Sequence, residues 1–340
     1  MSNYDVETRG GRAAKTTLLG ILALAILIAT SLGSLFIGIR YISLDDITLS
    51  FTNYDPNSIG QMIVQTLRLP RMIAGIVVGI SFAVSGALMQ GVTNNPMASP
   101  SILGINAGAS FGLAVGMILF PYLTLNGSIL FSFGGAALAT LFILALAKRV
   151  GGKATPVYLA LAGTAISAVF VAVTHMLVVY FQVAQELSFW TAGGISGIRM
   201  EQELLVLPWT LIGILIAMYV SKSVTLLSFG EEVAIGLGSN LNRVRVLSGL
   251  TVLILSGSAV ALAGPIGFVG LVIPHITRKL VGIDYRLVIP FSALFGAVLV
   301  MIADVVARIV NPPFETPLGA ITALVGVPFF IYLANRKGGK

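Results

Sequence analysis

Long apolar runs, separated by short polar links, follow one another along nearly the whole chain. A helix needs about 20 predominantly apolar residues to cross the hydrocarbon core of a bilayer. Runs of this kind predict ten membrane-spanning helices, the eighth of which is short. Their approximate ranges are 17–39, 65–91, 101–120, 128–147, 156–181, 204–221, 244–263, 267–280, 287–308 and 317–334. The pattern predicts an all-α, polytopic membrane protein.

The first apolar run follows a basic start and could be mistaken for a secretory signal. The apolar part of a signal peptide is about 7–15 residues long and ends at small residues. Here the run extends from Thr16 to Ile39, which is long enough to cross a bilayer. We therefore expect a retained first helix, preceded by a cytoplasmic tail over residues 1–16.

Composition supports the membrane interpretation. Of the 340 residues, 56% are hydrophobic and 10% are charged, whereas soluble domains carry about 25% charged residues. The chain has no cysteine and only two histidines, so neither a disulfide framework nor a conventional zinc site is predicted. The net charge of +7 indicates cytoplasmic loops rather than a nucleic-acid partner.

The distribution of basic residues predicts the orientation. If both termini are cytoplasmic, fifteen of the twenty Lys and Arg residues lie in cytoplasmic segments and five lie on the outer side. Membrane proteins concentrate Lys and Arg in their cytoplasmic loops. The expected protein crosses the membrane many times, with both termini in the cytoplasm and no separate soluble domain within residues 1–340.

Two further patterns concern the packing of the helices. Glycines recur every four residues at 104, 108, 112 and 116, which places them on one helix face where backbones can approach closely. A faint repeat relates residues 69–71 and 85–86 to residues 241–243 and 256–257. Five predicted spans separate the two copies, so they would form an inverted repeat of the kind common in transporters.

The cytoplasmic loop over residues 222–243 predicts a short helix. Glu231 and Glu232 would lie at its N-terminus, where the helix dipole favours acidic side chains, and Gly238 would end it. Its small apolar face would consist of Val233, Ala234 and Leu237. A short amphipathic helix suits the groove of a soluble partner, and a plain solvated loop is the alternative.

Other polar features are few. Two prolines and three glycines interrupt residues 263–278, residues 91–100 form a tight polar link, and residues 67–71 place two arginines on the outer side. Asp304 and Arg308 are four residues apart and could pair on one helix face. The ionisable residues near the membrane are too few for a proton relay, and no catalytic cluster is evident.

Together these segments resemble the FecCD family, the permeases of bacterial importers for iron-siderophores, haem and cobalamin. The resemblance extends from about Arg68 to the C-terminus and is carried by residues 67–71, 95–100, 264–275 and 315–319. It implies the architecture of a type II ABC-importer permease in the bacterial inner or plasma membrane. Such permeases work in pairs, so the partner would be a second copy of this chain or a close relative.

The resemblance also implies the remaining partners. Two ATPase subunits would bind on the cytoplasmic side, and an extracytoplasmic substrate-binding protein would dock outside. The chain has no Walker motif, so ATP would be bound and hydrolysed by the separate subunits. We therefore expect a transport subunit that is not itself an enzyme and needs no cofactor or metal of its own.

Specific residues match the family's functional positions. The residues implied in docking of the binding protein are Arg68, Arg71 and Arg308. Those implied in coupling to the ATPases are Gly230, Glu231, Glu232, Ala234 and Gly238. Asn95 and Met97 match a cytoplasmic gate.

The sequence leaves the cargo open. A ferric siderophore is the commonest cargo of the family and is predicted first, with haem and cobalamin as alternatives. A proton-driven secondary transporter is a rival class, which would need buried carboxylates or histidines along its path. A membrane-embedded enzyme is a third, which would need a catalytic cluster.

Overall fold

The computed structural model describes residues 9–38, 40–149, 156–312 and 314–337, and none of these lies in a β-strand. The expected all-α fold is confirmed for this part of the chain. Its elements in chain order are α1 (Arg9–Phe36), α2 (Leu44–Thr52), α3 (Ile59–Ile63), the π-helical turn η1 (Val64–Arg68), α4 (Leu69–Val92), the 3-10 turn η2 (Pro100–Leu103), α5 (Ile105–Leu119), α6 (Leu125–Arg149), α7 (Pro156–Phe181), α8 (Ala184–Thr191), α9 (Met200–Ser228), α10 (Glu231–Gly236), α11 (Leu241–Ala263), α12 (Val269–Val281), α13 (Tyr285–Ile309) and α14 (Leu318–Lys337).

Each of the ten predicted spans coincides with a helix, but the helices differ in length. Seven are long and apolar enough to cross a membrane: α1, the continuous α3–α4 segment, α6, α7, α9, α11 and α13. α5 and the described apolar part of α14 are shorter, and α12 has 13 residues. The chain is an integral membrane protein, and the count of ten spans stays a prediction.

Part of the predicted N-terminal tail is helical, and its cytoplasmic location stays a prediction. α1 begins at Arg9, so it includes part of the range assigned to the tail. Residues 1–8 lie outside the described part of the chain.

Polar residues in the short links begin several helices. The Ser43 hydroxyl accepts a hydrogen bond from the Asp46 amide at 3.0 Å, and the Asp46 carboxylate in return accepts one from the Ser43 amide at 3.3 Å. Asn240 and Asp284 cap α11 and α13 in the same way, through single side-chain oxygens. Each cap satisfies an amide that has no partner within the helix. The links therefore determine where the apolar helices start.

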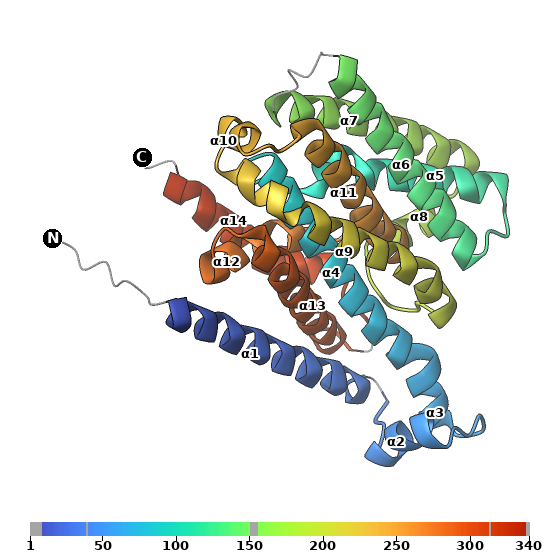
Figure 1. Ribbon diagram of the computed structural model, residues 1–340. Coiled ribbons are helices and arrows are strands. Elements are labelled where there is room, and N and C mark those ends of the chain that lie inside the picture. The colour runs from blue at the N-terminus through green and yellow to red at the C-terminus, as the bar shows by residue number, and fades with distance from the viewer. Residues whose placement is uncertain (1–8, 39, 150–155, 313, 338–340) are drawn as a thin grey trace.

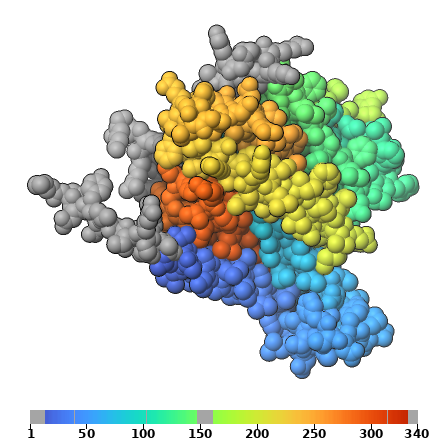
Figure 2. Space-filling model, viewed as in Figure 1, coloured from blue at the N-terminus to red at the C-terminus, as the bar shows by residue number. Residues whose placement is uncertain are grey.

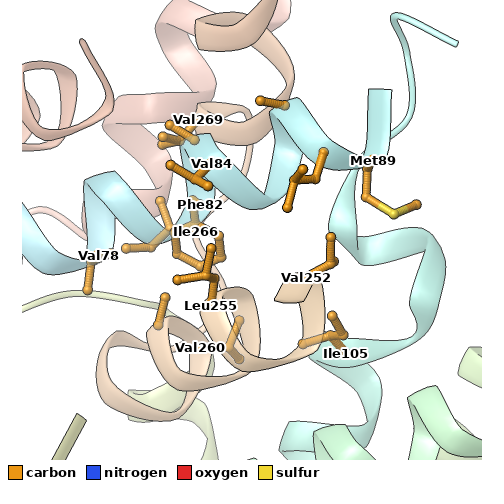
Figure 3. Packing of buried hydrophobic residues seen from close by; sticks show 14 of the residues in the cluster. Val78, Phe82, Val84, Met89, Ile105, Val252, Leu255, Val260, Ile266 and Val269 are labelled. Atoms are coloured by element: carbon orange, nitrogen blue, oxygen red, sulfur yellow. The ribbon is translucent and has the colours of Figure 1, made fainter. Parts of the chain in front are cut away.

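α4 is the central helix of the bundle. The apolar window of the α3–α4 segment is 78% buried, whereas the windows of α1 and α7 are 17% and 11% buried. α13, α11, α12 and α9 all pack against α4, and α5 packs along α6. Figure 3 shows the core where Phe82 and Val84 of α4 meet Leu255 and Val260 of α11 and Val269 of α12.

Glycines allow helix backbones to touch at several crossings. A Cβ atom added to Gly108 or Gly112 would lie 2.4 Å from the Gly135 carbonyl oxygen or 2.1 Å from that of Phe131. The close glycine-lined approach expected for this segment is confirmed between α5 and α6. Gly104 is an exception, because it is the N-cap of α5 and does not lie on its helical face.

The two ends of the bundle differ in shape. In Figure 1, α10 and the C-terminal end of α14 lie at one end and α2 and α3 at the other. Figure 2 shows α2 and α3 standing out from the rest of the molecule. α4 and α11, which carry the two similar segments, pack against each other, and their inverted relation stays a prediction.

Candidate functional site

The arginine cluster at the α2–α3 end consists of Arg68, Arg71 and Arg308, which come from η1, α4 and α13. Asp304 of α13 is 1% exposed, and each of its carboxylate oxygens serves a different arginine. Oδ1 accepts from Arg71 Nε and Nη2 at 2.9 and 2.8 Å, and Oδ2 accepts from Arg308 Nη2. The predicted pairing of Asp304 with Arg308 is confirmed, and Arg71 completes it from α4.

Two of the arginines also end α1. The last carbonyl groups of a helix have no partner within it. Arg308 Nη1 donates to the carbonyl oxygens of Ser34 and Ile37 at 3.0 and 3.1 Å, and Arg68 donates to those of Leu35 and Arg40. The cationic groups therefore satisfy the C-terminal end of α1, where the helix dipole favours positive charge.

This arrangement changes the interpretation of the predicted docking residues. The structure brings Arg68, Arg71 and Arg308 together, but each has internal partners. Arg68 and Arg308 have side chains only 6% exposed, and that of Arg71 is 12% exposed. Arg68 and Arg308 donate to backbone carbonyl oxygens at the end of α1, and counting charges along the sequence cannot reveal such internal acceptors. Their docking role stays a prediction.

Glu315 is the more accessible acid of the cluster, and it lies in the link between α13 and α14. It accepts a hydrogen bond from Arg71 Nη1 at 2.6 Å, and its side chain is 35% exposed. Burial alone would raise the pKa of this carboxyl. The hydrogen bond and charge of Arg71, with Ser196 and Arg308, outweigh burial and lower the pKa below its ordinary value. The carboxylate is therefore charged at neutral pH.

At the opposite end, α10 confirms the predicted short helix. Gly230 precedes it with a φ of 118°, and Gly238 follows it with a φ of 81°, conformations that favour glycine. Glu231 and Glu232 occupy its first turn, and Glu231 forms an ion pair with Arg245 of α11.

The apolar face of α10 differs from the one predicted. Ala234 is fully buried and holds α10 against the rest of the chain, so its side chain is not available to a partner. The exposed apolar side chains are Phe229, Val233, Ile235 and Leu237. Ile235 was not predicted, because a helix of fewer than two turns gives too little periodicity to assign its faces. The available surface is therefore larger and more apolar than expected.

The link between α4 and η2 holds the predicted gate residues. Asn95 is exposed, and its Oδ1 accepts a hydrogen bond from the Met97 amide at 2.9 Å. Met97 is half-buried. The neighbouring Asn94 donates from Nδ2 to the Leu227 carbonyl oxygen at the end of α9, at 3.1 Å. The gate link is thus fixed at its start to the helix that leads into α10.

The interrupted segment after α11 packs inside the protein. Pro274 within α12 has no N–H, so the Gly270 carbonyl lacks its usual helical donor. Gln90 Nε2 reaches the Gly270 and Leu271 carbonyl oxygens at 3.2 and 3.1 Å. Its Oε1 accepts from Arg278 Nη2 at 2.5 Å.

Gln90 was not predicted, although it is an amide near the end of an otherwise apolar run. Gln90 reaches α12 because the two helices cross in contact. A Cβ atom on Gly86 would lie 1.9 Å from the Gly270 carbonyl oxygen.

A second residue missed by the sequence analysis is Glu203, in the first turn of α9. It is 1% exposed, and neither carboxylate oxygen has a hydrogen-bond partner among the described residues. Its position beside Glu201 in a polar stretch suggested a surface residue. Among the described residues, no three His, Cys, Asp or Glu side chains are grouped so that they could hold a metal ion.

Known proteins resemble this chain over almost its full length. The model of the FecCD transport family matches residues 23–336. The Iron(3+)-hydroxamate import system permease protein FhuB of Bacillus subtilis is 45% identical over 304 residues, which are 89% of this chain and 79% of the relative. The Fe(3+)-citrate import system permease protein YfmD of the same organism is 43% identical over 327 residues, or 96% and 97% of the two chains.

A solved structure shares the fold. It is an inward-facing conformation of a metal-chelate type ABC transporter, with a TM-score of 0.82 and 28% sequence identity. The match covers 94% of this chain and 99% of that chain. The shorter helices α5 and α12, and all of α14 except its last residue, fall within the residues matched by the family model.

Proposed function

This chain belongs to the FecCD transport family, and we propose that it is the permease subunit of an ATP-binding-cassette importer for a ferric siderophore. The observation that carries this proposal is the near-full-length likeness to permeases named for iron(3+)-hydroxamate and Fe(3+)-citrate import. Both names specify ferric iron held by an organic chelator. Haem and cobalamin are the alternative cargoes within the family.

The partners follow from the family and from the two ends of the bundle. α10 presents exposed apolar side chains on a short helix with an acidic first turn, a surface suited to the groove of an ATPase subunit. Two such subunits bind a pair of permeases and hydrolyse ATP, so this chain is not itself the enzyme. A binding protein docks at the end that carries α2, α3 and the arginine cluster.

In this arrangement the binding protein contacts the accessible members of the arginine cluster rather than all three arginines equally. Arg71 and Glu315 are the more accessible members of the cluster, whereas Arg68 and Arg308 hold α1 beneath them. The α10 end faces the cytoplasm, as the excess of basic residues in its loops indicates. Both termini then lie on the cytoplasmic side of the bacterial plasma membrane.

The passage for the chelate is closed toward the cytoplasm by the link that contains Asn95 and Met97. A ferric chelate is large and polar, so it needs a wide passage rather than a tight cage of charged ligands. This fits the small number of charged side chains in the described membrane-spanning helices.

One observation favours the rival class. The buried, unpartnered carboxylate of Glu203 is the kind of group that a proton-coupled transporter would use. An importer driven by ATP has no need of it as a proton carrier. A Glu203→Gln variant, which removes the titratable group but keeps the shape of the side chain, therefore separates the two mechanisms.

The test is uptake into vesicles that contain the permease, its ATPase subunits and the binding protein. We expect uptake of a radiolabelled ferric hydroxamate to require ATP, to persist when an ionophore collapses the proton gradient, and to survive Glu203→Gln. Uptake that follows the proton gradient and is lost in Glu203→Gln would favour the secondary transporter. Preferential uptake of haem or cobalamin would change the cargo but not the mechanism.

A further inference from the structure

One carbonyl oxygen at the end of α9 joins the start of α10 to the gate link. The Leu227 oxygen accepts a hydrogen bond from the Gly230 amide at 3.0 Å, and Gly230 is the N-cap that directly precedes α10. The same oxygen accepts from Asn94 Nδ2 at 3.1 Å. A displacement of this turn must therefore stretch or carry the bond to Asn94.

The backbone conformation of Asn94 ends α4. α4 ends at Val92, and Asn94 follows with a φ of 49°, in the left-handed region. A left-handed residue just beyond the last turn is a common way to end a helix, and asparagine is one of the few side chains that tolerates it. The backbone of Asn94 ends α4, and its side chain is free to make the bond to α9.

The surrounding contacts make this junction stiff. Gly91, in the last turn of α4, lies so close to α9 that an added Cβ atom would be 2.5 Å from Val224 Cγ1. Leu227 itself is 1% exposed, Ala234 of α10 is fully buried, and α10 packs against α9. Packed elements of this kind move together rather than deforming gradually.

We propose that Asn94 is a positioning residue that couples the movement of α10 to the gate link through its bond to the Leu227 carbonyl. When the ATPase subunits move α10, the turn at residues 227–230 moves, and Asn94 shifts the adjacent Asn95 and Met97. The inference rests on the proposed function and specifies the connection between its two cytoplasmic parts.

Two substitutions separate the side chain from the backbone. Asn94→Gly keeps the left-handed conformation that ends α4 and removes the donor. Asn94→Asp keeps the shape of the side chain and replaces the donor with an acceptor that faces the Leu227 oxygen. Gln182 is a matched control because it also has a positive φ, 59°, and lies beyond α7 on an exposed segment.

The measurement is ATP hydrolysis and ferric hydroxamate uptake in the same vesicles, with the complete complex. We expect both Asn94 variants to hydrolyse ATP normally while uptake per ATP falls by about threefold to tenfold, the factor carried by one hydrogen bond. Gln182→Gly should leave uptake per ATP unchanged.

A second readout follows the gate link directly. The native chain has no cysteine, so Ser99→Cys at the end of the link is the only thiol of the permease, and its labelling is read on the permease band alone. Its rate of modification should change when ATP and vanadate are added to the complex, and Asn94→Gly should abolish the change.

The outcomes distinguish the inference from the proposed function. No ATP-driven uptake by the unaltered complex would overturn both. Normal uptake per ATP in both Asn94 variants would overturn the inference alone. A parallel loss of hydrolysis and uptake, or failure of both variants to assemble, would also overturn it, because Asn94 would then only hold the fold.

Discussion

At the scale of single residues, Asp304 is a buried charge whose stability depends on two arginine partners. Its side chain is 1% exposed and lies between the guanidinium groups of Arg71 and Arg308. A buried charge is tolerated only when it is paired and hydrogen-bonded. Removing the carboxylate would leave Arg308 without its acid partner while its nitrogens remain tied to the end of α1.

We therefore predict that Asp304→Asn destabilises the protein by about 3–5 kcal/mol, the cost of breaking a buried ion pair. The loss should appear as a lower midpoint of thermal unfolding of the permease in detergent. Asp45→Asn, at an exposed position in the first turn of α2, is the control and should have little effect. Equal midpoints for the two variants would show that Asp304 contributes no net stability.

Glu315 predicts how this cluster responds to acid. Its pKa is lower in the folded protein than its ordinary value, so its contribution is fully present above the ordinary glutamate pKa of about 4.3. It is lost as the pH falls through the folded-state pKa. We expect Glu315→Gln to remove part of the drop in unfolding midpoint between neutral pH and pH values below about 4. An unchanged acid response, with exposed Glu201→Gln for comparison, would contradict this.

Residue types were easier to predict than their partners. The sequence correctly placed Glu231 and Glu232 at a helix start and paired Asp304 with Arg308, because both inferences depend on local spacing. It missed Gln90 and Glu203, whose burial depends on helices distant in sequence. It also could not show that Arg68 and Arg308 end α1, because acceptor carbonyls leave no mark on the sequence.

At the scale of elements, α10 has two faces with different tasks. Ala234 is buried against the chain, whereas the side chain of Ile235 is 59% exposed. Ala234 therefore contributes to the folding of the permease, whereas Ile235 is available for association with a partner subunit. The sequence predicted where α10 begins and ends, through Glu231 and Gly238, but not which side it presents.

We predict that Ile235→Lys leaves the isolated permease stable and weakens its association with the ATPase subunits by about fivefold or more, as loss of an apolar anchor does. Ala234→Lys should instead lower the thermal stability of the isolated permease, because it forces a charged chain into a filled space. Thermal unfolding of the permease alone and co-purification of the ATPase subunits measure the two effects. Identical behaviour of the two variants in both assays would refute this division.

At the scale of the whole molecule, the apolar pattern predicted the positions of the helices well. Every predicted span overlaps a helix, because continuous apolar runs in a membrane protein leave the backbone few other ways to satisfy its hydrogen bonds. The pattern could not show which of these helices are long enough to span the membrane by themselves. α12 is shortened by the breaks around residues 264–268, and α5 begins only after the η2 turn.

The proposed orientation predicts opposite labelling of two loops. Ser196 is exposed in the segment between α8 and α9, and Ser239 lies between α10 and α11. In intact cells, Ser196→Cys should react with an impermeant thiol reagent and Ser239→Cys should react only after the membrane is permeabilised. The absence of native cysteine provides a clean background. The reverse pattern would place both termini outside the cell.

The glycine crossings have a consequence for the genetics of this protein. Gly79, Gly86 and Gly112 each face a backbone carbonyl oxygen that an added Cβ would approach to 2.4, 1.9 and 2.1 Å. All glycine codons begin with two guanines, and every missense change of one nucleotide installs at least a β-carbon. These codons have no conservative neighbour, so a library of random point mutations selected for uptake should be depleted at them as strongly as at stop codons. Loss-of-function alleles would then accumulate at buried positions in the middle of the helices.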